Sequence, residues 1–133
     1  MFDSLTCDSG FGFGLAKRLD SLGFTVFAGC LLADSGGEGS KKIRAECSSR
    51  LNTIIYIQID VTDDGQVKAA VRQVENSLPT ESEGLYALVN NAVVWQPGEI
   101  EWVSIAAYRH VMEVNTFGTV RVTKAFLPLI TSM

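Results

Sequence analysis

Three glycines at alternate positions, Gly10, Gly12 and Gly14, follow a polar turn near the start of the chain, in the stretch TCDSGFGFG. The first N–H groups of a helix have no partner inside the helix, and with the helix dipole they favour an anion such as a pyrophosphate. Glycine lets the phosphates of a ligand approach the backbone. Because the spacing differs from the pattern G-x-G-x-x-G, these glycines alone fit a flexible turn as well as a phosphate-binding turn.

Asparagines form the second group of residues that could do chemistry. Asn90 and Asn91, in VNNA, end an apolar run and so stand at the carboxyl edge of an expected strand, where doubly wound sheets bind ligands. Asn115, in EVNTFG, interrupts an apolar helix, where an amide is costly unless it has a structural or catalytic partner. Each asparagine alone is more simply structural, but their order after a glycine turn favours a ligand site.

The elements that would position these residues alternate in hydrophobic period. Short apolar runs rich in β-branched and aromatic residues predict buried strands at residues 24–32, 53–61 and 85–94. Amphipathic segments between them predict helices at residues 11–22, 38–47 and 62–78. This βαβαβ order predicts an α/β fold built on a doubly wound parallel sheet.

The longest expected helix begins near Ser104 and ends near Leu129, stopped by Pro128 and a polar tail. Its apolar residues form one stripe and a second set that lies off this stripe. The stripe holds Val111, Val114, Val122, Ala125 and Leu129, and the second set holds Met112, Val120, Phe126 and Leu127. One sheet cannot cover both faces, so the pattern favours more chain and a second subunit against this helix.

Composition argues against several other classes. The 133 residues are 47% hydrophobic and 20% charged, which fits one globular domain with a core. A net charge of -4 gives no indication of a basic face that would bind nucleic acid or anionic lipid. Three cysteines without C-x-x-C spacing and a single histidine argue against a metal site. The sequence shows neither a signal peptide nor a stretch long enough to cross a bilayer.

Four motifs in order make the chain resemble the short-chain dehydrogenase/reductase family. They are the turn TCDSGFG, Asp60-Val61 at the end of the third strand, NNA at residues 90–92, and VNTFGTV around Asn115. The stretches CDSGFGFGLAKRLDSLGFTVFAG and GTVRVTKAFLPLI look more like the hydroxybutyrate, retinol and hydroxysteroid dehydrogenase branch. The resemblance implies a truncated Rossmann-like domain over residues 1–133, with strand order 3-2-1-4 and a shortened first strand. It also implies an NAD(P)-dependent oxidoreductase that acts on a secondary alcohol or ketone of the hydroxy acid, retinoid or steroid class.

The resemblance also assigns roles to single residues. Those expected at the pyrophosphate turn are Thr6, Ser9, Gly10, Phe11 and Gly12. Those expected beside the adenine are Asp60 and Val61, and those beside the ribose are Asn91 and Ala92. Asn115 corresponds to the asparagine that holds a water in the proton relay of the active site, and is the one catalytic residue expected in this chain.

The resemblance favours NAD over NADP without excluding NADP. The two positions after the second strand that could bind a ribose phosphate are occupied by Cys30 and Leu31, not by arginine or lysine. The glycine turn contains no arginine or lysine either. The implied partners are a small-molecule substrate and a second copy of the chain on the long helix, with no nucleic acid. Relatives in this branch suggest the mitochondrion or the endoplasmic reticulum.

The sequence departs from the family pattern at both ends of the cofactor site. The glycine expected after Thr6 is absent, and Val93 replaces the glycine of Asn-Asn-Ala-Gly, which narrows the space beside the cofactor. The first strand, in MFDSLT, carries Asp3, which a central strand would bury or which would cut the strand short.

The proton-transfer residues of the family are not found in this sequence. Four residues after Tyr56, Tyr86 and Tyr108 stand aspartate, asparagine and methionine, so the Tyr-x-x-x-Lys pair is absent. The serine expected on a fifth strand is also missing, so we expect this chain alone to show no turnover. The alternative is a non-catalytic binding or interaction fragment with a vestigial cofactor turn. A third candidate, a transferase of similar architecture, is not supported by the asparagine motifs.

Overall fold

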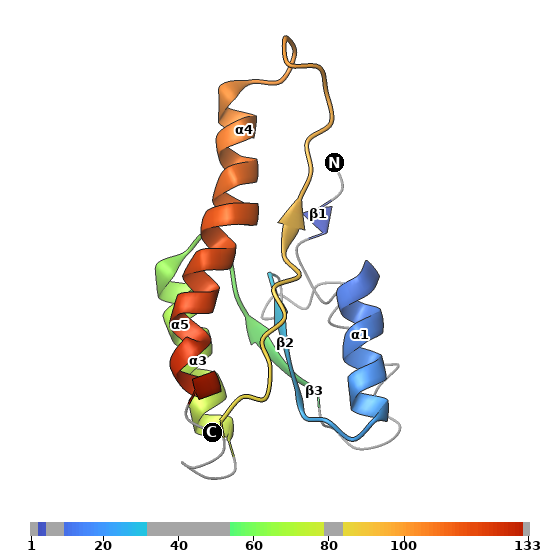
Figure 1. Ribbon diagram of the computed structural model, residues 1–133, viewed down its shortest axis with the longest axis vertical. Coiled ribbons are helices and arrows are strands. Elements are labelled where there is room, and N and C mark those ends of the chain that lie inside the picture. Colours follow the sequence, from blue (N-terminus) through green and yellow to red (C-terminus); the bar gives the residue numbers. More distant parts are fainter. Residues whose placement is uncertain (1–2, 5–9, 32–53, 79–83, 132–133) are drawn as a thin grey trace. The chain divides into compact units, whose positions relative to one another are not determined.

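The computed structural model describes residues 3–4, 10–31, 54–78 and 84–131 (Figure 1). The chain forms two compact units, one of residues Leu5–Asp60 and one of Met1–Ser4 with Val61–Met133. The described elements are β1 (Asp3–Ser4), α1 (Gly10–Ser21), β2 (Val26–Cys30), β3 (Ile54–Gln58), α3 (Asp64–Ser77), β4 (Val93–Val94), α4 (Ile105–Met112), the π-helix η1 (Glu113–Gly118) and α5 (Thr119–Thr131).

Helix α1 starts at the first glycine of the turn and ends in a glycine cap. Gly23 has φ +89°, a left-handed conformation that glycine adopts without strain. The N–H of Gly23 donates to the carbonyl of Asp20 at 2.9 Å, and that of Phe24 to the carbonyl of Leu19 at 3.1 Å. This pair of bonds is the Schellman motif, which satisfies carbonyls at the helix end and turns the chain toward β2.

Strands β2 and β3 form the parallel pair that the apolar runs predict. Their register places Val26 opposite Ile54 and Cys30 opposite Gln58. The side chains of Ala28 and Cys30 are fully buried, as expected for strands covered on both faces. At Gly29 an added Cβ would lie 2.8 Å from Cγ2 of Ile59, so glycine is what allows this close approach. The helix expected at residues 38–47 lies outside the described residues.

Helix α3 confirms the helix predicted at residues 62–78. Its N-cap is Asp63, whose Oδ1 accepts hydrogen bonds from the N–H groups of Gly65 at 2.7 Å and Gln66 at 3.0 Å. The buried side of the helix repeats at helical spacing and comprises Val67, Ala70 and Val74.

The long helix is present, but it is not a uniform α-helix and it does not stop at Pro128. It begins after Ser104, whose Oγ accepts the N–H of Ala107 at 3.2 Å, and it runs through α4, η1 and α5 (Figure 1). Pro128 lies inside α5, which continues to Thr131. A proline removes one helical hydrogen bond. Here that loss falls in the last turn, and the carbonyl of Leu129 accepts the N–H of Leu85 at 2.8 Å, which fixes the helix end.

The two apolar sets of this helix separate as expected, with one exception. Val114 and Val122 of the predicted stripe are buried, whereas Met112, Val120 and Leu127 of the second set are about half exposed. Phe126 was expected in the second set but is 6% exposed, so it belongs with the core.

The strand order 3-2-1-4 is observed only in part. β2 lies beside β3, and β1 lies beside β4, as that order requires. However, β1 pairs with β4 in antiparallel fashion, Asp3 opposite Val94 and Ser4 opposite Val93, whereas a parallel first strand was expected. Among the described strands no pairing joins β1 to β2. The strand expected at residues 85–94 is reduced to Val93–Val94, the two residues that pair with β1.

Candidate cofactor and active site

The amide of Asn115 binds both backbone polar groups of Val94. Its Oδ1 accepts the N–H of Val94 at 2.9 Å, and its Nδ2 donates to the carbonyl of Val94 at 2.9 Å. Val94 is 6% exposed, so both groups are removed from water and need partners. Asn115 therefore takes the place of a neighbouring strand at this residue. The sequence left open whether the amide has a structural or a catalytic partner, and its structural partner is Val94.

The segment from Leu85 to Val94 runs along the long helix in the opposite direction and is tied to it at three points. The N–H of Leu85 donates to Leu129, the Nδ2 of Asn90 to Oγ1 of Thr123 at 3.0 Å, and Val94 meets Asn115. Asn91 and Ala92, the residues expected beside the ribose, lie between the last two points and are half-buried. The asparagines were expected at the carboxyl end of a strand, but the described strand β4 is Val93–Val94, so Asn90 and Asn91 precede it. The helix thus sets the position of the segment that carries them.

Asn115 lies in the π-helix η1, whose wider turn takes up about one residue more than an α-helical turn. The Oγ1 of Thr119 donates to the carbonyl of Asn115 at 2.9 Å. Gly118, at the end of η1, is buried against Val61: an added Cβ would lie 2.7 Å from Cγ2 of Val61. The structure therefore brings together Val61, expected beside the adenine, and the helical turn that carries Asn115.

Arg121 links this turn to the start of α3 and is a residue that the sequence reasoning missed. Its Nε donates to Oδ1 of Asp64 at 2.6 Å, its Nη1 to the carbonyl of Val61 at 2.7 Å, and its Nη2 to Oε1 of Glu113 at 2.8 Å. The hydrogen bond with Glu113 is the largest cause that raises the pKa of Arg121 above its usual value, followed by that with Asp64. The only signal in the sequence is a cation placed between two valines, Val120 and Val122.

The remaining predicted site residues belong to the unit Leu5–Asp60 or to its edge. Gly10, Phe11 and Gly12 form the first turn of α1, and the side chain of Phe11 is 94% exposed. Asp60 follows β3 and is half-buried. Thr6 and Ser9 lie outside the described residues.

The first turn of α1 fits a pyrophosphate by its chemistry. It contains no acidic side chain that would repel an anion, and its residues Gly10 and Gly12 have no Cβ to keep a phosphate from the backbone. Further along the helix, an added Cβ at Gly14 would meet nothing within 4 Å. These residues therefore suit the phosphate end of a dinucleotide.

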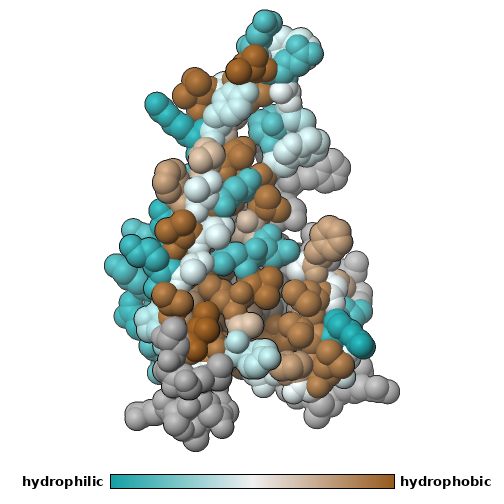
Figure 2. Space-filling model, viewed as in Figure 1, coloured by the Kyte–Doolittle hydropathy of each residue, from teal (hydrophilic) through white to brown (hydrophobic). Residues whose placement is uncertain are grey.

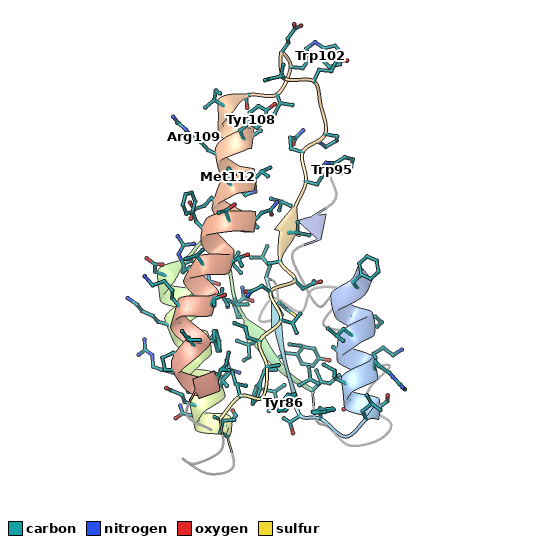
Figure 3. The ribbon with its side chains drawn as sticks, in the orientation of Figure 1. Tyr86, Trp95, Trp102, Tyr108, Arg109 and Met112 are labelled. Carbon is teal, nitrogen blue, oxygen red and sulfur yellow. The ribbon has the colours of Figure 1, made fainter. Side chains whose placement is uncertain are left out.

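The segment between β4 and α4 carries two aromatic side chains, Trp95 and Trp102 (Figure 3). Trp95 is 72% exposed and Trp102 is 75% exposed, and Tyr108 of α4 is 40% exposed. In Figure 3, Arg109 points away from the segment that carries Trp95. Within this chain both tryptophans lie at the surface, where they can report on a ligand by fluorescence.

Comparison with known proteins identifies the family. The sequence profile described as short chain dehydrogenase matches residues 5–132. D-beta-hydroxybutyrate dehydrogenase, mitochondrial, of Bos taurus is 50% identical over 124 residues, which are 93% of this chain and 35% of the relative. Estradiol 17-beta-dehydrogenase 2 of Mus musculus is 51% identical over 124 residues, which are 92% of this chain and 31% of the relative. The crystal structure of NADPH-bound carbonyl reductase from chicken fatty liver matches with a TM-score of 0.82 and 27% identity, over 92% of this chain and 48% of that one.

The chain belongs to the short-chain dehydrogenase family, as its motifs predicted. Its α/β fold is Rossmann-like, as in the structures that it matches. It spans about a third of the length of the two curated relatives, 35% and 31%. In the described part of the chain, no helix is both long and apolar enough to span a membrane.

Proposed function

We propose that this chain is the cofactor-binding part of an NAD(P)-dependent oxidoreductase that interconverts a secondary alcohol and its ketone. The hydroxybutyrate and estradiol dehydrogenases among its relatives favour a small hydroxy acid or a steroid as substrate, with a retinoid as a further candidate. The hydroxybutyrate relative, whose name includes "mitochondrial", favours the mitochondrion as its compartment, and the endoplasmic reticulum is the second candidate. When bound, the nicotinamide accepts or donates the hydride.

The observation that carries the proposal is the double hydrogen bond between Asn115 and Val94, beside the segment of Asn91 and Ala92. It fixes the position of Val94 in β4, two residues after Ala92. In the proposed site, Gly10 and Gly12 would hold the pyrophosphate with the first N–H groups of α1. Val61 would contact the adenine, and Asn91 the ribose.

Asn115 is the proposed catalytic residue, in the sense that it would orient a water of the proton relay. Its side chain is committed to Val94, so this role would fall to its backbone carbonyl, which in the structure accepts the hydroxyl of Thr119. The proton donor itself is not among the 133 residues, because no tyrosine is followed four residues later by lysine. We therefore propose that the chain binds cofactor but has no turnover alone, and detection of NAD-dependent alcohol oxidation by it would contradict this part.

NAD is the proposed cofactor. β2 ends at Cys30, and neither that residue nor Leu31 carries a positive charge that could hold a ribose phosphate. Competition between NADH and NADPH for the same chain tests this choice, and tighter binding of NADPH would overturn it.

Titration with NADH, followed by the fluorescence of Trp95 and Trp102, tests the proposal as a whole. Saturable binding is expected for the parent chain. Gly12→Val should abolish it, because a branched side chain would block the phosphate turn. Gly14→Ala, two residues further along α1 where an added Cβ meets open space, is the matched control and should bind as the parent does. Absence of saturable binding by the parent would favour the non-catalytic alternative.

An exposed apolar face of the long helix supports a second copy of the chain as partner. Ile105, Met112, Phe117 and Val120 are 64%, 49%, 55% and 51% exposed. They follow one side of the helix, since the step of five from residue 112 to 117 falls in the π turn. Apolar side chains recur over this helix in the space-filling view (Figure 2). We propose that the full-length enzyme is a homo-oligomer joined through this face.

A further inference from the structure

We propose that Arg121 is a positioning residue that holds the turn of residues 61–64 against the long helix and so fixes the surface offered to the adenine. The inference rests on the proposed function, because it concerns the residue, Val61, that would contact the adenine. Arg121 would not touch the cofactor; it would act through the backbone of Val61.

The guanidinium is committed to three acceptors from three parts of the unit. Its Nη1 holds the carbonyl of Val61 at 2.7 Å, its Nε holds Asp64 at the start of α3, and its Nη2 holds Glu113 of η1. Bonds between a guanidinium and carboxylates are charge-assisted and directional, so they fix geometry as well as energy. The side chain of Arg121 is 23% exposed but that of Asp64 is 73% exposed, so salt screens the contact with Asp64 more than the part-buried bond to the carbonyl of Val61. With its three kinds of nitrogen used in this way, Arg121 is a clamp on the turn and not a phosphate ligand.

The turn is held on its apolar side as well. Val61 is 8% exposed and lies directly on Gly118, where any Cβ would come within 2.7 Å of its Cγ2. The carbonyl of Val61 faces Arg121, and its side chain faces the helix backbone at Gly118. Movement of the turn would break the hydrogen bond or open the contact, so the two interactions together define one position.

The π turn is what allows Glu113 to complete this clamp. Glu113 and Arg121 are eight residues apart, which in a regular α-helix places them about 80° apart around the axis. A π turn takes up about one extra residue, so the pair lies on nearly the same side, about two turns apart. The same turn presents Asn115 to Val94. One irregular turn therefore positions both the end of β4 and the turn after β3.

Two variants and a matched control test the inference. Arg121→Met keeps an apolar stem but removes the three hydrogen bonds, and Glu113→Gln weakens the clamp while keeping the shape of the side chain. Lys124→Met, an exposed cation on the same helix, is the control. The first readout is amide hydrogen exchange at residues 61–64, which does not depend on cofactor. The second is the affinity of the full 133-residue chain for AMP and for nicotinamide mononucleotide.

We expect Arg121→Met to speed exchange at residues 61–64 and to weaken AMP binding about tenfold, with nicotinamide mononucleotide unaffected. Glu113→Gln should weaken AMP binding about threefold, and Lys124→Met should change nothing. A merely structural role would weaken both ligands alike through loss of folded protein. If Arg121→Met does not fold, Glu113→Gln decides the question by the same two readouts.

The outcomes separate the inference from the proposed function. If the parent chain binds AMP and the folded variants bind it equally well, the inference is overturned and the proposed function stands. Unchanged amide exchange in the folded variants would also overturn the inference, whatever the ligand data show. If the parent binds neither NADH nor AMP, the proposed function fails and the adenine role of Arg121 fails with it.

Discussion

At the scale of single residues, Asn115 shows how one amide can replace a strand. An amide offers one acceptor and a donor group at the spacing needed for a residue's own N–H and C=O, and here both are used on Val94. A polar residue inside an apolar helix is then favourable, because the backbone groups that it satisfies would otherwise be buried without partners. The cost of this half-buried amide is offset by the cost that it prevents at Val94.

The first prediction follows from this pair. Asn115→Leu, similar in size, should lower the free energy of unfolding by about 1–3 kcal/mol, because it leaves the N–H and C=O of Val94 without partners. Urea unfolding followed by circular dichroism measures the change. Asn90→Ala, which removes a more exposed hydrogen bond to Thr123, is the control and should stay within about 0.5 kcal/mol of the parent. Equal stability of the Asn115→Leu variant and the parent would contradict the structural role.

The second prediction concerns the cap of α3. Hydrogen bonds from the N–H groups of Gln66 and Gly65 hold the pKa of Asp63 below its ordinary value of 3.8. Because the pKa is lower in the folded chain, the stabilisation is present at neutral pH and is lost as the pH falls from about 4 through the folded value. Asp63→Asn, which keeps an acceptor but loses the charge, should lower Tm at pH 7 and flatten its acid dependence.

Melting curves recorded between neutral and acidic pH measure this effect. Asp63→Asn removes one acidic group from α3, so an exposed acid elsewhere on that helix, Glu75→Gln, serves as the control. If the Tm difference between the Asp63→Asn variant and the parent is the same at acidic and neutral pH, the carboxylate is not the source of the cap's pH dependence.

At the scale of elements, the long helix is the least uniform part of the structure. The sequence predicts its start near Ser104 correctly, because an N-cap serine is a local signal. It does not reveal the π turn, since the extra residue is stabilised by distant partners: Val94 for Asn115, and Val61 for Gly118 and Arg121. Pro128 misleads for the same reason, because a contact from Leu85 fixes the helix beyond it.

Two glycines in helices give the third prediction, with opposite signs. Alanine favours a helix over glycine by up to about 1 kcal/mol, so Gly14→Ala, which meets nothing within 4 Å, should stabilise the chain. Gly118→Ala should destabilise it by about 1–3 kcal/mol despite that gain, because its Cβ would lie 2.7 Å from Val61. Thermal unfolding of the two variants measures the contrast, and a stabilised Gly118→Ala would show that Val61 does not pack as described.

At the scale of the whole molecule, the sequence predicts the fold class and family better than the site. Buried strands, amphipathic helices and four ordered motifs are local patterns, and they lead correctly to a Rossmann-like short-chain dehydrogenase. The direction of β1 is not determined by a local sequence pattern. A strand of two residues is too short for its sequence to specify whether it runs parallel or antiparallel to β4. The clamp of Arg121 is also non-local, as it joins residues about 60 positions apart.

The fourth prediction concerns assembly through the exposed face of the long helix. Val120 is 51% exposed on that face, and Val120→Glu should convert an oligomer to a monomer at micromolar concentration, because a charge would be buried in the interface. Ala69→Glu adds the same charge at an exposed position of α3 and should leave the oligomer intact. Light scattering after size-exclusion chromatography measures the mass. A monomeric parent would contradict assembly of this chain through the helix.

The bond between Asn115 and Val94 has a further effect on how the chain meets other chains. A strand edge with free N–H and C=O groups is a template on which a foreign strand can add. On the side of β4 that faces the helix, the N–H and C=O of Val94 are already bound by the side chain of Asn115. A side chain cannot continue the row of strand hydrogen bonds to a further chain. Asn115 thus closes that side of β4 to intermolecular pairing, and its loss would expose a site for aggregation.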